Sequence, residues 1–182
     1  MKESAVPLRR RSSFTRSLLD IMLLALIAFA VAHSAGQTVV VAGSSMRSAL
    51  ESEDRLIVSP LIYDLESPRR GDLVVFAPVG VEPNHEFIKR LVALPGDRLR
   101  IDHAKLFLNG REVRETYLTL AWTTNTSYHD GSEFTLGPDQ YFLMGDNRDG
   151  SLDSRIFGPQ PRRTFLGRVV IRIWPIDRIR LY

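Results

Sequence analysis

The sequence predicts a mainly β domain of largely antiparallel strands, preceded by one N-terminal transmembrane helix. A long apolar stretch near the N-terminus carries no formally charged residue, and short β-like runs separated by turn residues follow it. No long pattern of helical periodicity competes with these strands. With 182 residues, 44% of them hydrophobic and 25% charged, the chain has the size and composition of one folded domain plus an extra segment.

The apolar stretch from Ile21 to Ala42 matches a membrane helix in length. At about 1.5 Å per residue, about 20 helical residues cross a hydrocarbon core of roughly 30 Å. The β-branched residues 38–41 after Gly36 favour a strand, so we expect the helix to occupy residues 17–36. Asp20 then lies near the inner end of the helix, where its carboxylate reaches the headgroups at modest cost.

Basic residues cluster in the first 16 positions and predict the orientation of this helix. Clusters of this kind stay on the cytoplasmic side while the apolar segment inserts. The cluster consists of Lys2, Arg9, Arg10, Arg11 and Arg16, against the single acidic residue Glu3. We therefore expect a cytoplasmic segment 1–16, a single-pass signal anchor 17–36 in the cytoplasmic membrane, and an extracytoplasmic domain 37–182. A cleavable signal peptide ending near Ala32 is the alternative for this region, and it gives the same orientation.

The chain carries a net charge of +3, and its basic cluster abuts an apolar segment instead of forming a patch within a folded domain. This arrangement favours a lipid bilayer as partner and gives no reason to expect nucleic acid.

The expected strands are eight short runs rich in β-branched and apolar residues. They are Thr38–Ala42, Arg55–Val58, Asp72–Ala77, Phe87–Ala93, Leu99–Ile101, Lys105–Leu108, Tyr141–Met144 and Val169–Trp174. The dipeptide Asn109-Gly110 predicts a hairpin between residues 106–108 and 112–113. Residues from about 98 to 138 are less apolar than the rest, so we expect a small cap inserted in the β domain.

Several catalytic classes are excluded or disfavoured by composition. The chain has no cysteine, which excludes a thiol nucleophile, disulfides and cysteine-based zinc sites. Its four histidines are scattered, and His85-Glu86 lacks the second histidine of a zinc-protease helix. No glycine loop of the phosphate-binding type is present. We therefore expect neither a metal nor a cofactor.

The first segment that can carry chemistry is Gly43-Ser44-Ser45-Met46. A glycine–serine turn directly after a strand exposes a hydroxyl and frees backbone N–H groups to face an incoming carbonyl. An ordinary surface loop is the alternative reading of this segment alone.

The second segment contains Lys89. On a strand alternate residues share a face, so Phe87, Lys89 and Leu91 lie together. Burial between large apolar neighbours disfavours the charged amine and lowers its pKa, and a neutral lysine can remove a proton from a serine hydroxyl. The alternative is a lysine whose stem covers a core edge while its amine stays in water.

The third segment, residues 145–155, is dense in short polar side chains and turn formers. If Gly150 were the turn glycine of a calcium loop, the end ligands would be Gly145 and Ile156, which offer no side-chain oxygen. A fixed polar network in which Asp153 and Arg155 pair is therefore preferred over a calcium loop or a solvated loop.

Together these segments resemble the bacterial type I signal peptidases over nearly the whole chain after the basic N-terminus. The resemblance consists of an anchor helix followed by four motifs in the family's order. The motifs are Gly43-Ser44-Ser45-Met46, Arg70-Gly71-Asp72-Leu73-Val74-Val75-Phe76, Ile88-Lys89-Arg90 with Leu94-Pro95-Gly96-Asp97, and residues 145–155.

The resemblance implies a role for each matching residue. Ser45 is similar to the family's nucleophile, Lys89 to its general base, and Ser151 to a serine that hydrogen-bonds and orients the lysine. Asp153 and Arg155 match a supporting ion pair. Gly43, Ser44 and Ser45 form the expected oxyanion region. The residues expected to line shallow pockets for small side chains at positions −1 and −3 of a signal peptide are Val41, Met46, Leu50, Phe87 and Ile88.

The chain departs from the family after the nucleophile. Members usually have Met-X-Pro-Thr-Leu there, whereas this chain has Met46-Arg47-Ser48-Ala49-Leu50, and loss of the proline should loosen the turn.

The function implied is removal of N-terminal signal peptides from exported preproteins by a membrane-bound serine endopeptidase, a hydrolase that works without a cofactor. Three alternatives remain at this point. The chain could be a peptidase dedicated to one secreted or pilus substrate, or an inactive membrane-bound homologue that acts as a binding protein. The third is a soluble self-cleaving Ser/Lys repressor. Such a protein would need a helix-turn-helix before its protease domain, and in this chain the predicted membrane anchor occupies that place.

Overall fold

The computed structural model describes residues 17–25, 36–81, 85–119, 122 and 129–182. The chain divides into two compact units, residues 1–35 and residues 36–182. The second unit contains every β-strand found in the described residues.

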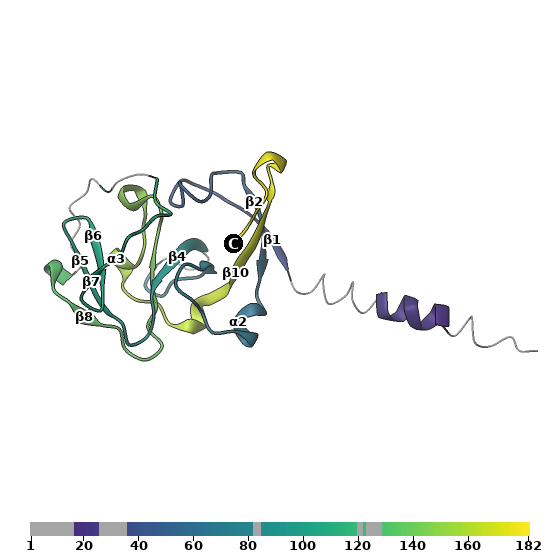
Figure 1. Cartoon of the computed structure of the whole chain (residues 1–182), viewed down its shortest axis with the longest axis horizontal. Helices are drawn as coiled ribbons and strands as arrows, with labels where there is room; N and C mark the ends of the chain where they lie inside the picture. The colour runs from purple at the N-terminus through teal and green to yellow at the C-terminus, as the bar shows by residue number, and fades with distance from the viewer. Residues whose placement is uncertain (1–16, 26–35, 82–84, 120–121, 123–128) are drawn as a thin grey trace, which may run out of the picture. The chain divides into compact units, whose positions relative to one another are not determined.

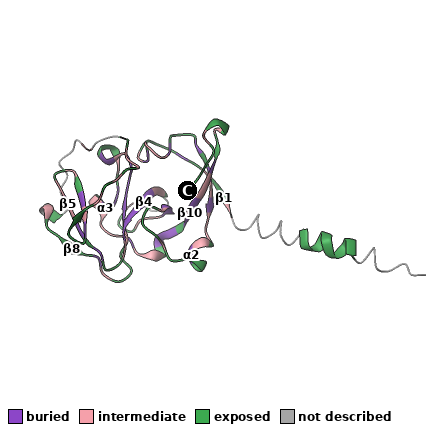
Figure 2. Cartoon of the chain, viewed as in Figure 1, coloured by how far each residue is buried: buried purple, intermediate pink, exposed green. Residues whose placement is uncertain are grey.

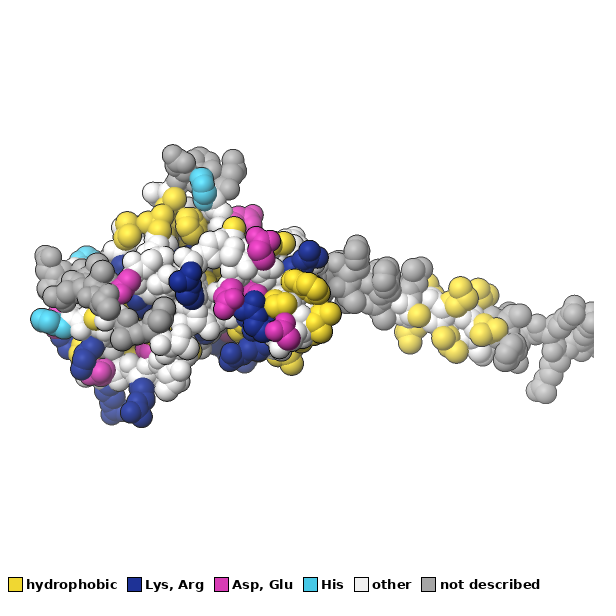
Figure 3. All heavy atoms as spheres, turned by 90° about the horizontal axis from the view of Figure 1, so that it is seen from above, with side chains coloured by type: hydrophobic (Ala, Val, Ile, Leu, Met, Phe, Trp, Pro, Cys, Tyr) yellow, Lys and Arg dark blue, Asp and Glu magenta, His cyan; other side chains and the backbone are white. Residues whose placement is uncertain are grey.

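The described part of the first unit is a helix over residues 17–25. Its large apolar side chains are exposed, and they are Leu18, Leu19, Ile21, Met22, Leu23 and Leu24 (Figure 3). Among the described residues, no helix is both long and apolar enough to cross a membrane. The span predicted over residues 17–36 lies partly outside the described residues, because they omit 26–35.

The second unit is built on a curved antiparallel sheet that contains seven strands within the described residues (Figure 1). The strands run in the spatial order β1, β2, β10, β3, β4, β9, and β11 pairs with β10. Their bounds are β1 Gln37–Val40, β2 Arg55–Ser59, β3 Leu73–Phe76, β4 Phe87–Ala93, β9 Phe142–Met144, β10 Phe165–Trp174 and β11 Arg180–Leu181. Because β1 ends the sheet, it is paired along one side only within the described residues.

A second antiparallel sheet is formed by residues of the predicted insertion, in the order β7, β6, β5, β8. Its strands are β5 Arg98–Asp102, β6 Lys105–Leu108, β7 Arg111–Glu112 and β8 Phe134–Thr135. Asn109 and Gly110 join β6 to β7 with positive φ angles of 54° and 79°, which confirms the predicted hairpin. This sheet has an apolar core of its own, where Leu99, Ile101 and Leu106 pack with Phe142 and Met144 of the first sheet.

Short helical turns complete the described part of the second unit. They are α2 Ile62–Leu65 and α3 Ser154–Phe157, with 3-10 turns at His129–Gly131, Arg148–Gly150, Arg162–Thr164 and Ile176–Arg178. None of these turns exceeds four residues, in keeping with a sequence that lacks a long amphipathic pattern.

A further apolar cluster lies directly beneath the segment that contains Ser45. Met46 and Leu50 from that segment are 2% and 1% exposed, and they pack with Leu56, Val75 and Val169 of the sheet. Burying a side chain of this size contributes about 1.5–3 kcal/mol, so these residues fix the segment firmly on the sheet. Buried stretches of β4 and β10 are purple in Figure 2.

All eight predicted strands are present, and the largest boundary error is at β10. This strand begins at Phe165, four residues before the predicted start at Val169. Gly167 reads as a strand breaker in the sequence, yet it pairs with Val75, and a Cβ at this position would lie 2.7 Å from the carbonyl oxygen of Ser59. The glycine is therefore needed for close backbone approach inside the sheet. The two-residue strands β7, β8 and β11 are too short to leave a periodic signal.

Candidate active site

Ser45 lies in a tight turn that follows β1. Gly43 starts the turn with a φ of 90°, a conformation that favours glycine, and the N–H of Arg47 donates to the carbonyl of Ser44 at 3.0 Å. Within the described residues, the N–H of Ser45 donates to no protein group. The turn thus presents both a hydroxyl and an unpaired backbone donor from the same residue.

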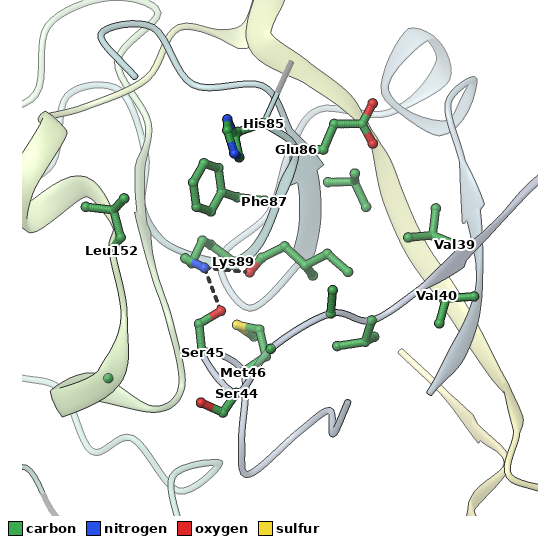
Figure 4. Close-up of a pocket in the computed structure, with 16 residues that line it drawn as sticks. Val39, Val40, Ser44, Ser45, Met46, His85, Glu86, Phe87, Lys89 and Leu152 are labelled. Atoms are coloured by element: carbon green, nitrogen blue, oxygen red, sulfur yellow. Dashed lines mark hydrogen bonds between the residues drawn. The ribbon is translucent and has the colours of Figure 1, made fainter. Parts of the chain in front are cut away.

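Lys89 reaches this hydroxyl from β4. Its side chain is almost fully buried, with 1% of the residue exposed, so the alternative of a lysine that keeps its amine in water is wrong. The Nζ atom donates to Ser45 Oγ at 2.7 Å and to the carbonyl of Ile88 at 3.2 Å (Figure 4). It also lies 5.1 Å from the centre of the Phe87 ring.

Burial lowers the pKa of Lys89 to about 8. The negative charge of Asp153 opposes this shift, the positive charge of Arg155 adds to it, and Asp146 opposes it less strongly. An amine with this pKa is neutral in roughly a tenth of the molecules at pH 7. Its lone pair can then accept the Ser45 proton over the same short distance.

The segment 145–155 holds the turn from the opposite side. Asn147 donates its backbone N–H to the carbonyl of Ser45 at 3.0 Å and its side-chain amide to the carbonyl of Ser44 at 3.1 Å. A Cβ at Gly145 would lie 2.6 Å from the Ser45 carbonyl oxygen, so only glycine permits this approach. The hydrogen bonds of Asn147 and the close approach of Gly145 therefore position Ser45.

The predicted pairing of Asp153 with Arg155 is confirmed. Arg155 donates from Nε and one terminal nitrogen to the two Asp153 oxygens, both at 2.8 Å. Asp153 is completely buried, caps the N-terminus of α3 and also accepts the N–H of Gly145 at 2.9 Å. One carboxylate thus fixes both the position of the segment and the electrostatic surroundings of Lys89.

The hydrogen bond predicted between Ser151 and Lys89 is not formed. Ser151 Oγ is buried without a hydrogen-bond partner, and it packs against Gly145. Within the described residues, Lys89 Nζ donates to Ser45 Oγ and to the Ile88 carbonyl instead. The resemblance places Ser151 in the segment 145–155 beside Ser45, but the sequence does not give the direction of its hydroxyl.

A groove of about 480 Å³ opens beside Ser45 and Lys89, between the β1 side and the start of β4 (Figure 4). Four of the five predicted pocket residues line it, namely Val41, Met46, Phe87 and Ile88. The fifth, Leu50, does not line the groove, because its side chain points into the apolar cluster below and is 1% exposed. Leu50 therefore lies beneath the groove wall in this structure, and its assignment to a substrate pocket stays a prediction.

The groove is also lined by residues that the sequence analysis did not assign to it. They include Val39, Val40, Val75, His85, Glu86 and Leu152. Alternation along β1 and β4 could have found Val39 and Glu86, whereas Leu152 is brought in only by the folding of the polar segment. Asn147 was likewise visible only as one of several turn-forming residues.

Ser48 shows how the turn closes without the family's usual proline. Its φ is 117°, and its hydroxyl lies 2.8 Å from Thr119 Oγ1 and accepts the Thr119 N–H at 3.2 Å. The next carbonyl, that of Ala49, accepts from Arg172 at 3.0 Å and from the Tyr182 hydroxyl at 2.9 Å. Side chains from segments far along the chain therefore hold this turn in place, where the family usually has a proline ring.

Changing Ser48 to Pro is expected to destabilise the protein and reduce its activity, although it restores the family's usual residue. Proline fixes φ near −65°, far from the observed 117°, so the cost should exceed about 1 kcal/mol. Ser48→Gly, which tolerates positive φ, is the matched control and should lose less stability. Thermal unfolding of both variants tests this, and a Ser48→Pro protein as stable as the wild type would contradict it.

Comparison with known proteins gives one consistent family. A family model described as signal peptidase, peptidase S26, matches residues 14–174. A probable signal peptidase I-2 from Synechocystis sp. is 38% identical over 142 residues, which cover 76% of this chain. The match spans 63% of that relative's own length, just under two thirds.

A signal peptidase I P from Bacillus subtilis subsp. natto is 32% identical over 182 residues, covering 94% of this chain and 95% of that protein. A crystal structure of a signal peptidase I from Enterococcus faecalis is 27% identical, with a TM-score of 0.48 over 57% of this chain and 97% of that one. The family model spans most of the chain and the relatives agree with it, so this chain belongs to the signal peptidase family, peptidase S26.

Proposed function

We propose that this protein is a membrane-bound signal peptidase I that removes N-terminal signal peptides from exported preproteins. The observation that carries the proposal is the 2.7 Å contact between Lys89 Nζ and Ser45 Oγ, made by a buried amine at the end of a groove. A serine beside a base with a lowered pKa is the arrangement that covalent catalysis of acyl transfer requires.

The substrate binds as an extended strand along the free side of β1. An edge strand offers unpaired backbone groups, and a peptide that pairs with it sends alternate side chains into the groove. The wall formed by Val41, Ile88 and Phe87 is apolar and close to Ser45, which suits small side chains at positions −1 and −3. Large side chains at these positions would collide with the wall.

Catalysis proceeds in two steps. Neutral Lys89 takes the Ser45 proton, and Oγ attacks the scissile carbonyl to form an acyl-enzyme while the protonated lysine gives its proton to the leaving amine. Lys89, neutral again, activates a water that releases the signal peptide. The free N–H of Ser45 donates to the oxyanion in both steps, and one such donor is typically worth about 3–4 kcal/mol.

The remaining residues support this pair. Asp153 and Arg155 position the segment 145–155, and Asn147 fixes the Ser45 turn. A membrane anchor over residues 17–36, with the N-terminus inside, keeps the site at the extracytoplasmic surface, where the helix of a signal peptide ends.

Cleavage by the detergent-solubilised full chain tests the proposal. A preprotein with a small-X-small site should be cut after that site, and Ser45→Ala should abolish the reaction. A panel of unrelated preproteins separates a general enzyme from one dedicated to a single substrate. Failure of the folded wild type to cut any of them would favour an inactive homologue.

The rate is expected to depend on the protonation of Lys89. Because only the neutral amine is a base, kcat/KM should rise with pH around a midpoint near the lysine pKa of about 8 and then level off. One unit below the pKa, roughly a tenth of the lysine is neutral, so the rate there should be about a tenth of the plateau. A peptide assay over a pH series measures this, and a profile flat across the pKa would contradict it.

A further inference from the structure

A second pocket adjoins the groove across the Ser45 turn. It has a volume of about 310 Å³ and is lined by Gly43, Ser44, Arg47, Glu51 and Ser52. We call it the exit pocket. Gly43 and Ser44 line both the groove and the exit pocket, so the two hollows meet at the turn that carries Ser45.

We propose that the exit pocket receives the first residues after the scissile bond, and that Arg47 makes it selective for an acidic side chain there. This inference rests on the proposed function, because it concerns the part of the preprotein that becomes the mature N-terminus. It assigns a binding role to residues outside both the Ser45/Lys89 pair and the apolar groove wall.

The direction of the substrate supports this assignment. The small side chains before the scissile bond occupy the groove, which extends from Ser45 toward Val39, His85 and Glu86. The chain after the bond must leave from the Ser45 end of the groove, and Gly43 and Ser44 border that end. The Ser44 side chain points away from Lys89 (Figure 4), and Ser44 also belongs to the exit-pocket lining.

The charge that remains to bind a substrate in the exit pocket is the positive charge of Arg47. Glu51 pairs with Arg178 at 2.7 Å, which offsets its negative charge. Arg47 is exposed and forms no ion pair with the residues that the structure describes. Its guanidinium can therefore bind a substrate carboxylate, and the nearby hydroxyls of Ser44 and Ser52 offer further hydrogen bonds.

Glycine at position 43 keeps the passage open. A Cβ built at Gly43 meets no atom within 4 Å, so the backbone here faces open space. The peptide can thus cross the turn close to the main chain, which brings its next side chains within reach of Arg47, two residues after Ser45.

Paired peptides test the inference directly. Each pair shares one small-X-small site and differs only in Asp or Lys at the first, second or third residue after the cut. Both peptides compete in one reaction with the full-length enzyme. The wild type should cut the Asp peptide roughly fivefold faster at one of these positions, as expected for an exposed ion pair, and less so at high salt.

Variants of Arg47 separate charge recognition from a structural effect. Arg47→Gln should remove the preference, Arg47→Lys should retain it and Arg47→Glu should reverse it, because the preference should follow the sign of the charge at this position. Arg111→Gln, which alters an exposed arginine on β7 of the second sheet, is the matched control and should leave the preference intact.

The outcomes are distinct. Equal rates for Asp and Lys at all three positions, or a preference that survives Arg47→Gln, would overturn the exit pocket alone, since the peptides would still be cut. Failure of the wild type to cut any peptide would overturn the proposed function, and the inference that rests on it.

Discussion

Replacing Lys89 with Met is expected to abolish cleavage while making the folded protein more stable. Methionine keeps the length and the burial of the side chain but cannot accept the Ser45 proton. A general base typically contributes about 10²–10⁴-fold, and groups that act as a unit with a nucleophile contribute more, so kcat should fall by at least about 10³-fold. Ser45→Ala should cause a loss of similar size, and the double variant little more.

The gain in stability follows from the lowered pKa. Below about pH 8 the folded protein carries a buried ammonium that water would solvate better in the unfolded chain. The depression from 10.5 to about 8 corresponds to a cost of on the order of 3 kcal/mol, which Met avoids.

The same shift fixes the pH window of this effect. Between about pH 8 and 10.5 the unfolded wild type binds more protons at this lysine than the folded protein does, so wild-type stability rises with pH and the advantage of Met shrinks. Denaturant unfolding at several pH values, with cleavage assays in parallel, measures both effects. Lys105→Met removes an exposed lysine from β6 and is the control, expected to change neither quantity. Wild-type cleavage by the Lys89→Met protein would refute the Ser/Lys pair.

Burial of Lys89 could be predicted because it depends on a local pattern. Alternation places Phe87, Lys89 and Leu91 on one face of β4, and large apolar neighbours on a strand indicate an interior position. The eight longer strands were predictable for the same reason. Each has its own run of apolar residues, and every connection between them except His103-Ala104, which joins β5 to β6, carries glycine, proline or asparagine.

The contacts between segments could not be predicted from local patterns. Leu50 and Met46 look equivalent in the sequence, but the turn sends Leu50 into the core while Met46 also reaches the groove. The unpaired hydroxyl of Ser151, the Asn147 contacts and the link from Ser48 to Thr119 depend on how distant segments dock. Side-chain direction in turns of irregular backbone leaves no periodic trace in a sequence.

A buried ion pair joins Arg90, the residue after Lys89, to Asp146, which lies between Gly145 and Asn147. Arg90 donates to both Asp146 oxygens, at 2.8 and 2.7 Å, and Asp146 is completely buried. Arg90 also donates to the Gly71 carbonyl at 2.9 Å and stacks on Tyr117 with a separation of 4.2 Å. The pair therefore fixes β4, which carries Lys89, to the segment that holds the Ser45 turn.

Asp146→Ala is expected to lower the free energy of unfolding by about 3–5 kcal/mol, because it leaves the Arg90 charge buried without its partner. Glu112→Ala, which breaks the exposed pair with Lys105, should cost at most about 1 kcal/mol and serves as the control. Thermal and denaturant unfolding of the full chain measure both losses.

The double variant Arg90→Met/Asp146→Ala decides whether the unpaired charge is the cause. If it is, removing Arg90 as well should recover part of the stability that Asp146→Ala loses, although the bonds to Gly71 and Tyr117 are gone. A double variant less stable than Asp146→Ala alone would mean that Arg90 acts mainly through those other contacts.

Because the negative charge of Asp146 raises the pKa of Lys89, loss of this charge in Asp146→Ala should also move the rise of kcat/KM to lower pH. A change confined to packing would lower the rate without moving that midpoint, so the pH profile of the destabilised variant shows whether the pair acts on the catalytic base through its charge or only through position.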